Sequence, residues 1–153
     1  MQIGSISGGT DILSCFVLNN PLDEVISGEI QCRGLGMAVD VFDEEGNSVT
    51  DTPGELVCTK PFPSMPIMFW NDPDGKKYQE AYFDYYPNVW RHGDWTKLTK
   101  RGTLVIFGRS DATLNPGGVR IGTAEIYKVV ESFEEILELS LIHISEPTRH
   151  DRI

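Results

Sequence analysis

The sequence predicts a mixed fold, α/β in the broad sense (α+β), in which short antiparallel strands come first and a helix follows. Short apolar runs, separated by turns rich in Gly, Pro and Asp, extend to about residue 107. Over residues 123–139 the apolar spacing then changes to that of one helix face. A glycine-rich polar connection, residues 108–118, joins the two parts, and we expect a boundary or hinge there.

Several runs in the first part are expected to form strands: residues 27–33, 37–43, 54–59, 89–92 and 103–107. Strands this short, with turns between them, are typical of a small antiparallel barrel or sandwich. Residues 60–75 hold four prolines among aromatic side chains. This stretch is not expected to form a helix or a central strand, because proline lacks the amide donor. The aromatic loop around Trp70 is expected to pack; a ligand cage is the alternative. Residues 79–86 could form a short helix.

The charge of the chain restricts its partners. Its 153 residues include 13 Lys and Arg against 23 Asp and Glu, a net charge of -10 at pH 7. Binding to nucleic acid needs clustered basic residues, so we expect none. No apolar run approaches the roughly 20 residues of a membrane span, and no secretory signal is visible, so we expect no membrane partner. Three widely spaced cysteines fit neither a disulfide framework nor a zinc pattern, which favours a reducing, cytoplasmic setting.

One polar segment near the N-terminus has residues suited to a phosphate. Gly8 and Gly9 allow close backbone approach, Thr10 supplies a hydroxyl, and Asp11 could hold Mg²⁺. The alternative is a plain turn that leads into a helix cap.

Two further segments offer a carboxylate and two arginines. Asp94 follows a glycine at the end of a predicted strand, where it could accept both hydroxyls of a ribose; the alternative is a hairpin turn. His92 beside it has the features of a partly exposed turn histidine. Arg109 and Arg120 flank the glycine-rich connection, and their forked donors match phosphate or paired acceptors. Structural salt bridges are the alternative.

Taken in order, these segments resemble the motifs of the adenylate-forming acyl-CoA synthetase superfamily. The matching stretches are residues 5–12, 54–61, 69–72, 92–94 and 108–120, and the resemblance extends over about residues 2–139. It implies a ligase that forms an acyl-adenylate from a carboxylic acid and ATP, and then an acyl-CoA thioester with CoA. The Ser7-Gly8-Gly9 segment favours the branch that activates acetoacetate. The alternatives are an acetate or other short-chain synthetase, or a non-catalytic nucleotide-binding β module.

The resemblance also implies roles on the nucleotide side. Thr10 would contact the nucleotide phosphate, following the Gly8-Gly9 turn, and Asp11 would stand at the Mg²⁺ position. Asp94 and Arg109 would bind the ribose. Ser7 replaces the aromatic residue usual in this motif.

The glycine-rich connection receives the remaining implied roles. Asp111 would be the hinge, Arg120 would act near the phosphates during adenylation, and Gly117 and Gly118 would approach the pantetheine of CoA. The resemblance divides the chain into the end of a large AMP-binding domain, residues 1–110, and the start of a small mobile domain, residues 111–139. Residues 140–153 resemble translated cloning sequence. The resemblance also implies a phosphate-binding loop upstream and a catalytic lysine downstream, neither of which this sequence contains, so we expect a fragment without ligase activity of its own.

Overall fold

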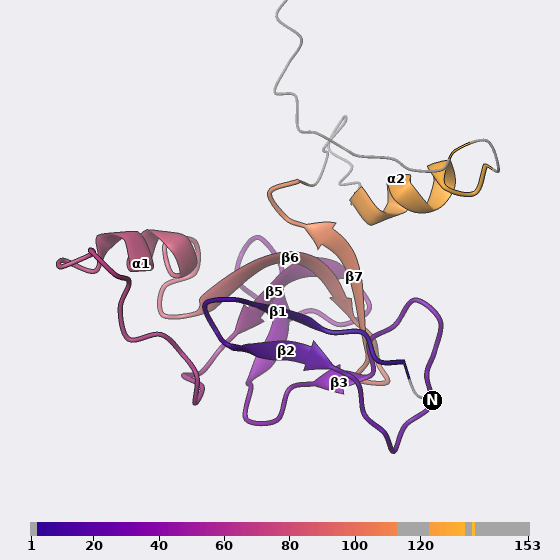
Figure 1. Ribbon diagram of the computed structural model, residues 1–153, viewed down its shortest axis with the longest axis horizontal. Helices are drawn as coiled ribbons and strands as arrows, with labels where there is room; N and C mark the ends of the chain where they lie inside the picture. The colour runs from indigo at the N-terminus through magenta and orange to yellow at the C-terminus, as the bar shows by residue number, and fades with distance from the viewer. Residues whose placement is uncertain (1–2, 113–122, 134–135, 137–153) are drawn as a thin grey trace, which may run out of the picture.

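The computed structural model describes residues 3–112, 123–133 and 136 (Figure 1). The elements in these residues are β1 (Ser7–Gly9), β2 (Ser14–Leu18), β3 (Cys32–Arg33), β4 (Val39–Phe42), β5 (Pro53–Cys58), α1 (Lys76–Tyr82), β6 (Trp90–Leu98), β7 (Leu104–Arg109) and α2 (Thr123–Val130). The described strands form two antiparallel sheets, ordered β1-β2-β3 and β4-β5-β6-β7. Antiparallel sheets with few helices agree with the mixed class predicted from the sequence.

The core lies where the two sheets meet. Alternate side chains of β6 are buried along its whole length, so one face of this strand points into the core. Aromatic rings fill the centre: Phe16 of β2 meets Phe62 edge-on at 5.3 Å between centroids, and Phe62 meets Trp90 of β6 at 5.5 Å. The largest fully buried side chains come from both sheets and the turn before β2: Ile12, Phe16, Val17, Val41, Leu56, Val57, Trp90 and Leu104. The sheets are thus held together mainly by apolar burial.

The sheets are also joined by one isolated backbone bridge between Ile30 and Leu104. The Ile30 amide donates to the Leu104 carbonyl at 2.7 Å, and the Leu104 amide donates to the Ile30 carbonyl at 2.9 Å. This bridge fixes the start of β7 against the segment that enters β3.

Several elements differ from the sequence prediction. Strand β6 continues six residues beyond His92, to Leu98. Gly93, where the sequence left a hairpin turn as the alternative, adopts a φ of +85° within the strand. Of the strand expected over residues 27–33, only Cys32–Arg33 and the bridge at Ile30 form. Strand β2 was not predicted. Helix α1 overlaps the predicted residues 79–86 but begins and ends earlier, at Lys76 and Tyr82, and α2 ends at Val130.

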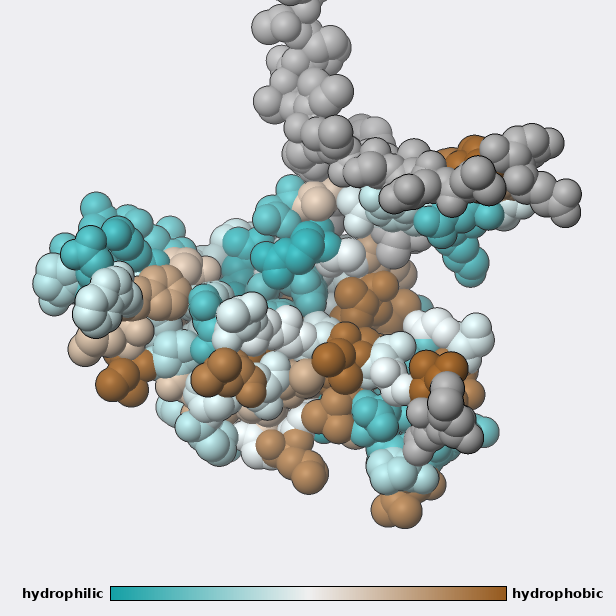
Figure 2. Space-filling model, in the orientation of Figure 1, coloured by the Kyte–Doolittle hydropathy of each residue, from teal (hydrophilic) through white to brown (hydrophobic). Residues whose placement is uncertain are grey.

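Large apolar side chains lie on the surface (Figure 2). In the proline-rich loop, Phe62 is buried in the core and Phe69 packs edge-on against Tyr78, so the aromatic loop packs as expected. Trp70 is the exception, because its side chain is 97% exposed. Its neighbours Ile67 and Met68 are also exposed. The loop itself forms neither helix nor strand, as predicted. Among the described residues, no helix has the length and apolar character needed to cross a membrane.

Candidate nucleotide site

Strand β1 is short and irregular, and its irregularity decides which side chain points inward. Ser7 pairs with Val17 and Gly8 pairs with Cys15, so the register shifts between Ser7 and Gly8. Shifts of this kind re-aim a side chain, and here Ser7 is buried while the two glycines after it are exposed. A Cβ on Gly8 would lie 2.3 Å from the Ser14 carbonyl oxygen, so this pairing requires glycine.

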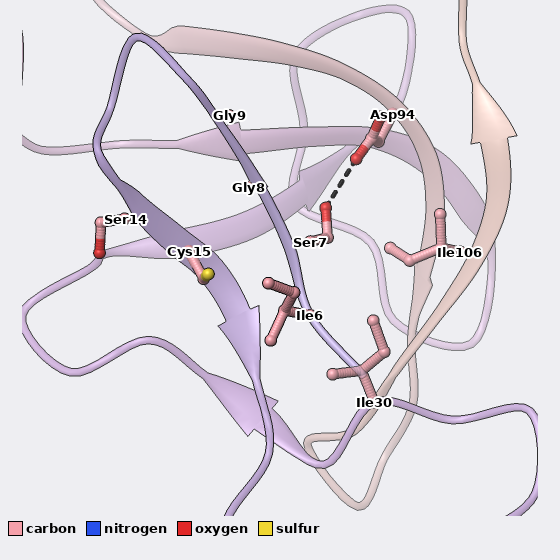
Figure 3. Close-up of a pocket in the computed structure, with 9 residues that line it drawn as sticks. All are labelled: Ile6, Ser7, Gly8, Gly9, Ser14, Cys15, Ile30, Asp94 and Ile106. Carbon is pink, nitrogen blue, oxygen red and sulfur yellow. Dashed lines mark hydrogen bonds between the residues drawn. The ribbon is translucent and has the colours of Figure 1, made fainter. Parts of the chain in front are cut away.

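A pocket of about 570 Å³ opens between β1 and β2 of one sheet and β6 and β7 of the other (Figure 3). Ser7, Ser14 and Asp94 supply its polar side chains, and three isoleucines supply most of its apolar lining. It is lined by Ile6, Ser7, Gly8, Gly9, Ser14, Cys15, Ile30, Asp94 and Ile106. The structure therefore brings together three residues assigned from sequence to one nucleotide: Gly8, Gly9 and Asp94.

The Asp94 carboxylate is held from both sheets. Ser7 Oγ of β1 donates to its Oδ2 at 2.7 Å, and Arg109 Nη1 of β7 donates to its Oδ1 at 3.2 Å. Asp94 and Arg109 are direct register partners between β6 and β7. The two residues predicted to share a ribose are thus neighbours, although they lie 15 positions apart in the sequence.

Gly93 makes room for the Arg109 side chain. A Cβ on Gly93 would lie 2.4 Å from Arg109 Nη2. With that space free, Arg109 Nη1 also donates to the His92 carbonyl at 2.9 Å. The guanidinium therefore contacts both the backbone of β6 and the Asp94 carboxylate.

His92 is a core residue, so its interpretation as a partly exposed turn histidine is wrong. The ring is 8% exposed and meets Phe16 edge-on at 4.9 Å, and its Nε2 lies 3.7 Å from Asp94 Oδ2. Burial lowers the pKa of His92, an effect that the Asp94 carboxylate and the Gly8 backbone partly offset. The neutral ring is therefore the stable form at neutral pH.

Thr10 and Asp11 lie in the exposed turn after β1, outside the residues that line the pocket. The Tyr82 hydroxyl of α1 donates to Asp11 Oδ2. Burial and this hydrogen bond raise the pKa of the Tyr82 phenol, which keeps it a donor. Among the described residues, no group of three or more His, Cys, Asp or Glu side chains could hold a metal. Asp11 therefore offers a single carboxylate.

The end of β7 is anchored to β5 and β6. Ser110 Oγ donates to the buried Glu55 Oε1 at 2.8 Å, and the Ser110 amide donates to the Gly93 carbonyl at 2.8 Å. Glu55 also pairs with Arg91 at 3.2 Å. Asp111 is exposed, with its Oδ1 3.5 Å from Arg109 Nε.

Four sequence assignments lie outside the described residues. They are Gly117, Gly118, Arg120 and the tail, residues 140–153. Sequence reasoning also missed the contacts of Ser7, Tyr82 and Glu55. The only signal for Ser7 was a small hydroxyl residue directly before two glycines.

This arrangement shares its fold with a solved CoA ligase. An anthranilate CoA ligase, solved in complex with anthranoyl-AMP, matches 80% of this chain with a TM-score of 0.64 at 21% sequence identity. The match covers 22% of that ligase. At this identity the comparison establishes the fold alone.

Two acetoacetyl-CoA synthetases are more similar to this chain. The acetoacetyl-coenzyme A synthetase of Rhizobium meliloti (strain 1021) is 66% identical over 138 residues, which are 90% of this chain and 21% of that protein. The solved acetoacetyl-CoA synthetase from Streptomyces lividans matches 88% of this chain and 21% of its own, with a TM-score of 0.83 at 56% identity. The resemblance found in the motifs is therefore confirmed. No protein-family model matches the chain. The chain spans about a fifth of the length of the relatives it matches.

Proposed function

We propose that the chain supplies the ribose-binding part of an ATP-dependent acetoacetate–CoA ligase. Its central feature is the Asp94 carboxylate, held by Arg109 at the edge of a pocket. The sequence around it is 66% identical to an acetoacetyl-CoA synthetase, which supports acetoacetate as the acid. In this reaction the carboxylate of the acid attacks the α-phosphate of ATP and releases pyrophosphate. The CoA thiol then attacks the acyl-adenylate and releases AMP.

The contacts of Asp94 suit a ribose. An ionised carboxylate offers about four acceptor positions. The Ser7 hydroxyl and Arg109 use one on each oxygen. One position on each oxygen remains, which is what two neighbouring hydroxyl groups require.

The phosphate end is assigned to the turn after β1. Thr10 would donate to the phosphate, and Asp11 would contribute one carboxylate to the Mg²⁺ that accompanies ATP. That ion is commonly held by one or two carboxylates together with the phosphates, so a single Asp11 fits it. The Mg²⁺ would offset negative charge on the phosphates, and Tyr82 would orient Asp11 through its hydrogen bond.

The rest of the assignment concerns the boundary after β7. Residues 1–110 would form the end of a large AMP-binding domain, including its small distorted barrel, and Asp111 would be the hinge to a small domain. Arg120, Gly117 and Gly118 keep their assigned roles near the phosphates and CoA on the strength of their motif alone. The Ser110–Glu55 hydrogen bond would hold the large-domain side of the hinge still during rotation.

A segment exchange tests this function. Residues 3–112 of this chain would replace the matching segment of the Streptomyces lividans enzyme. AMP formation would then be measured with acetoacetate, ATP and CoA, and with acetate as the competing acid. We expect AMP formation that depends on acetoacetate and falls at least tenfold with Asp94→Ala. A folded exchange protein that forms no AMP, or that prefers acetate, would refute the proposal.

Titration of the 153-residue chain with AMP gives a second test that does not depend on the exchange. Binding that Asp94→Ala removes is expected, and no binding would count against the nucleotide site.

A further inference from the structure

Ser7 contacts the Asp94 carboxylate from the opposite sheet to Arg109. Its Oγ lies 2.7 Å from Asp94 Oδ2, and both side chains are buried (Figure 3). A hydroxyl that donates to an ionised carboxylate forms a strong, charge-assisted hydrogen bond. We propose that Ser7 is a positioning residue that orients Asp94 so that the pocket selects a ribonucleotide over its 2′-deoxy analogue. This inference rests on the proposed function, since it assumes that a nucleotide occupies the pocket.

The local backbone is built for this contact. The register shift between Ser7 and Gly8 turns the Ser7 side chain into the pocket. Glycine at position 8 permits the shift, because any side chain there would meet the Ser14 carbonyl. The sequence Ser-Gly-Gly therefore places a hydroxyl against Asp94.

With both contacts in place, the carboxylate has a single orientation. Arg109 holds Oδ1 and Ser7 holds Oδ2, so the carboxylate plane cannot rotate without loss of one hydrogen bond. His92, 3.7 Å from Oδ2 and packed on Phe16, lies beside the same oxygen. The remaining acceptor positions are thereby fixed.

Fixed acceptors give selectivity. A site built to bind two hydroxyls discriminates against a ligand that lacks one, because a buried acceptor is then left without a partner. Without the Ser7 hydroxyl, the Asp94 carboxylate can rotate and bind a ribose that offers only one hydroxyl donor. The loss should therefore fall on AMP much more than on 2′-deoxy-AMP.

The test uses the full chain titrated with AMP and with 2′-deoxy-AMP, followed by nuclear magnetic resonance. Ser7→Ala should weaken AMP binding about tenfold, as expected for the loss of one hydrogen bond to a charged group. The ratio of the affinity for AMP to the affinity for 2′-deoxy-AMP should fall. Ser7→Thr keeps the hydroxyl and should retain the preference. Ser48→Ala, an exposed serine outside the pocket, is the matched control. Equal weakening of both ligands, or an unchanged preference in Ser7→Ala, would overturn the inference.

Two outcomes separate this inference from the proposed function. If the unmutated chain does not bind AMP, the nucleotide site itself fails, and the inference fails with it. If AMP binds and Ser7→Ala behaves like Ser48→Ala, only the role of Ser7 fails. A double-mutant cycle of Ser7→Ala and Asp94→Asn in urea unfolding tests the contact without any ligand. Coupling between the two changes supports the contact, and additive effects contradict it.

Discussion

Tyr82 lies flat on Trp90, with ring centroids 3.6 Å apart and an angle of 15° between the planes. Trp90 is a buried residue of β6, and the Tyr82 hydroxyl reaches Asp11. One side chain of α1 therefore connects the aromatic core to the turn that holds the candidate phosphate-binding residues.

This connection predicts different effects for two substitutions of Tyr82. Tyr82→Phe keeps the stacked ring and loses only the hydrogen bond, so we expect a loss of about 1 kcal/mol in the free energy of unfolding. Tyr82→Ala removes the ring as well and should cost about 3 kcal/mol or more. Urea unfolding of both variants measures the difference. Equal losses would show that the ring does not contribute.

Gly93 should be intolerant of any side chain. Gly93→Ala places a Cβ at a φ of +85° and 2.4 Å from Arg109 Nη2. Gly102→Ala is the matched control, because Gly102 has a φ of +86° and no atom within 4 Å of its Cβ position. We expect about 1 kcal/mol for Gly102→Ala and about 1–3 kcal/mol more for Gly93→Ala. Similar losses in thermal unfolding would mean that Arg109 moves aside freely.

Loss of either charge at the pocket edge should reduce nucleotide binding. Asp94→Asn removes the ionised acceptor, and Arg109→Leu removes the group that holds it. Each should weaken AMP binding by the full chain at least tenfold, about 1.4 kcal/mol. Asp84→Asn, at an exposed carboxylate, should leave the affinity unchanged. Isothermal titration with AMP checks all three, and an unaffected Asp94→Asn variant would contradict the assignment.

The buried His92 predicts a pH dependence of stability. Its pKa in the folded chain lies below the ordinary value of 6.5. As the pH falls through about 6.5, the unfolded chain therefore takes up a proton before the folded chain does, and the folded state loses stability. The loss levels off below the folded pKa. Urea unfolding between about pH 8 and pH 5 should show this decline, and His92→Gln should remove it.

Carboxylates with lowered pKa values affect stability in a different pH range from His92. Hydrogen bonds lower the pKa values of Glu29 and Asp43, so their contribution to stability is lost only at more acidic pH. A decline near neutral pH that persists in His92→Gln would therefore contradict the assignment to His92.

Three strands were predicted from short apolar runs bounded by turn residues, and β4, β5 and β7 formed close to the expected residues. The run over residues 27–33, which alternates, formed only Cys32–Arg33 and the bridge at Ile30. Strand β2, Ser14–Leu18, was missed because it follows directly after a polar, glycine-rich turn. The prediction also stopped β6 too early, because Gly93 followed by Asp94 has the composition of a turn. Here the long-range pairing with β5 and β7 overrides the local preference.

The candidate site was predicted through its motifs better than through its contacts. Asp94 and Arg109 were assigned to the same ribose, and the strand register places them side by side. The burial of His92 and the hydrogen bond from Ser7 depend on β1 packing across the second sheet, a contact between residues 87 positions apart. No local pattern in the sequence encodes such a contact.

The bridge between Ile30 and Leu104 couples the pocket to the contact between the two sheets. Ser7 belongs to one sheet and Arg109 to the other, so each sheet donates a hydrogen bond to the same Asp94 carboxylate. The Ile30–Leu104 pair joins the same two sheets through two backbone hydrogen bonds, and Ile30 also lines the pocket. Its two amides should therefore exchange with solvent in step with the opening of the pocket, and nucleotide bound at Asp94 should slow both together.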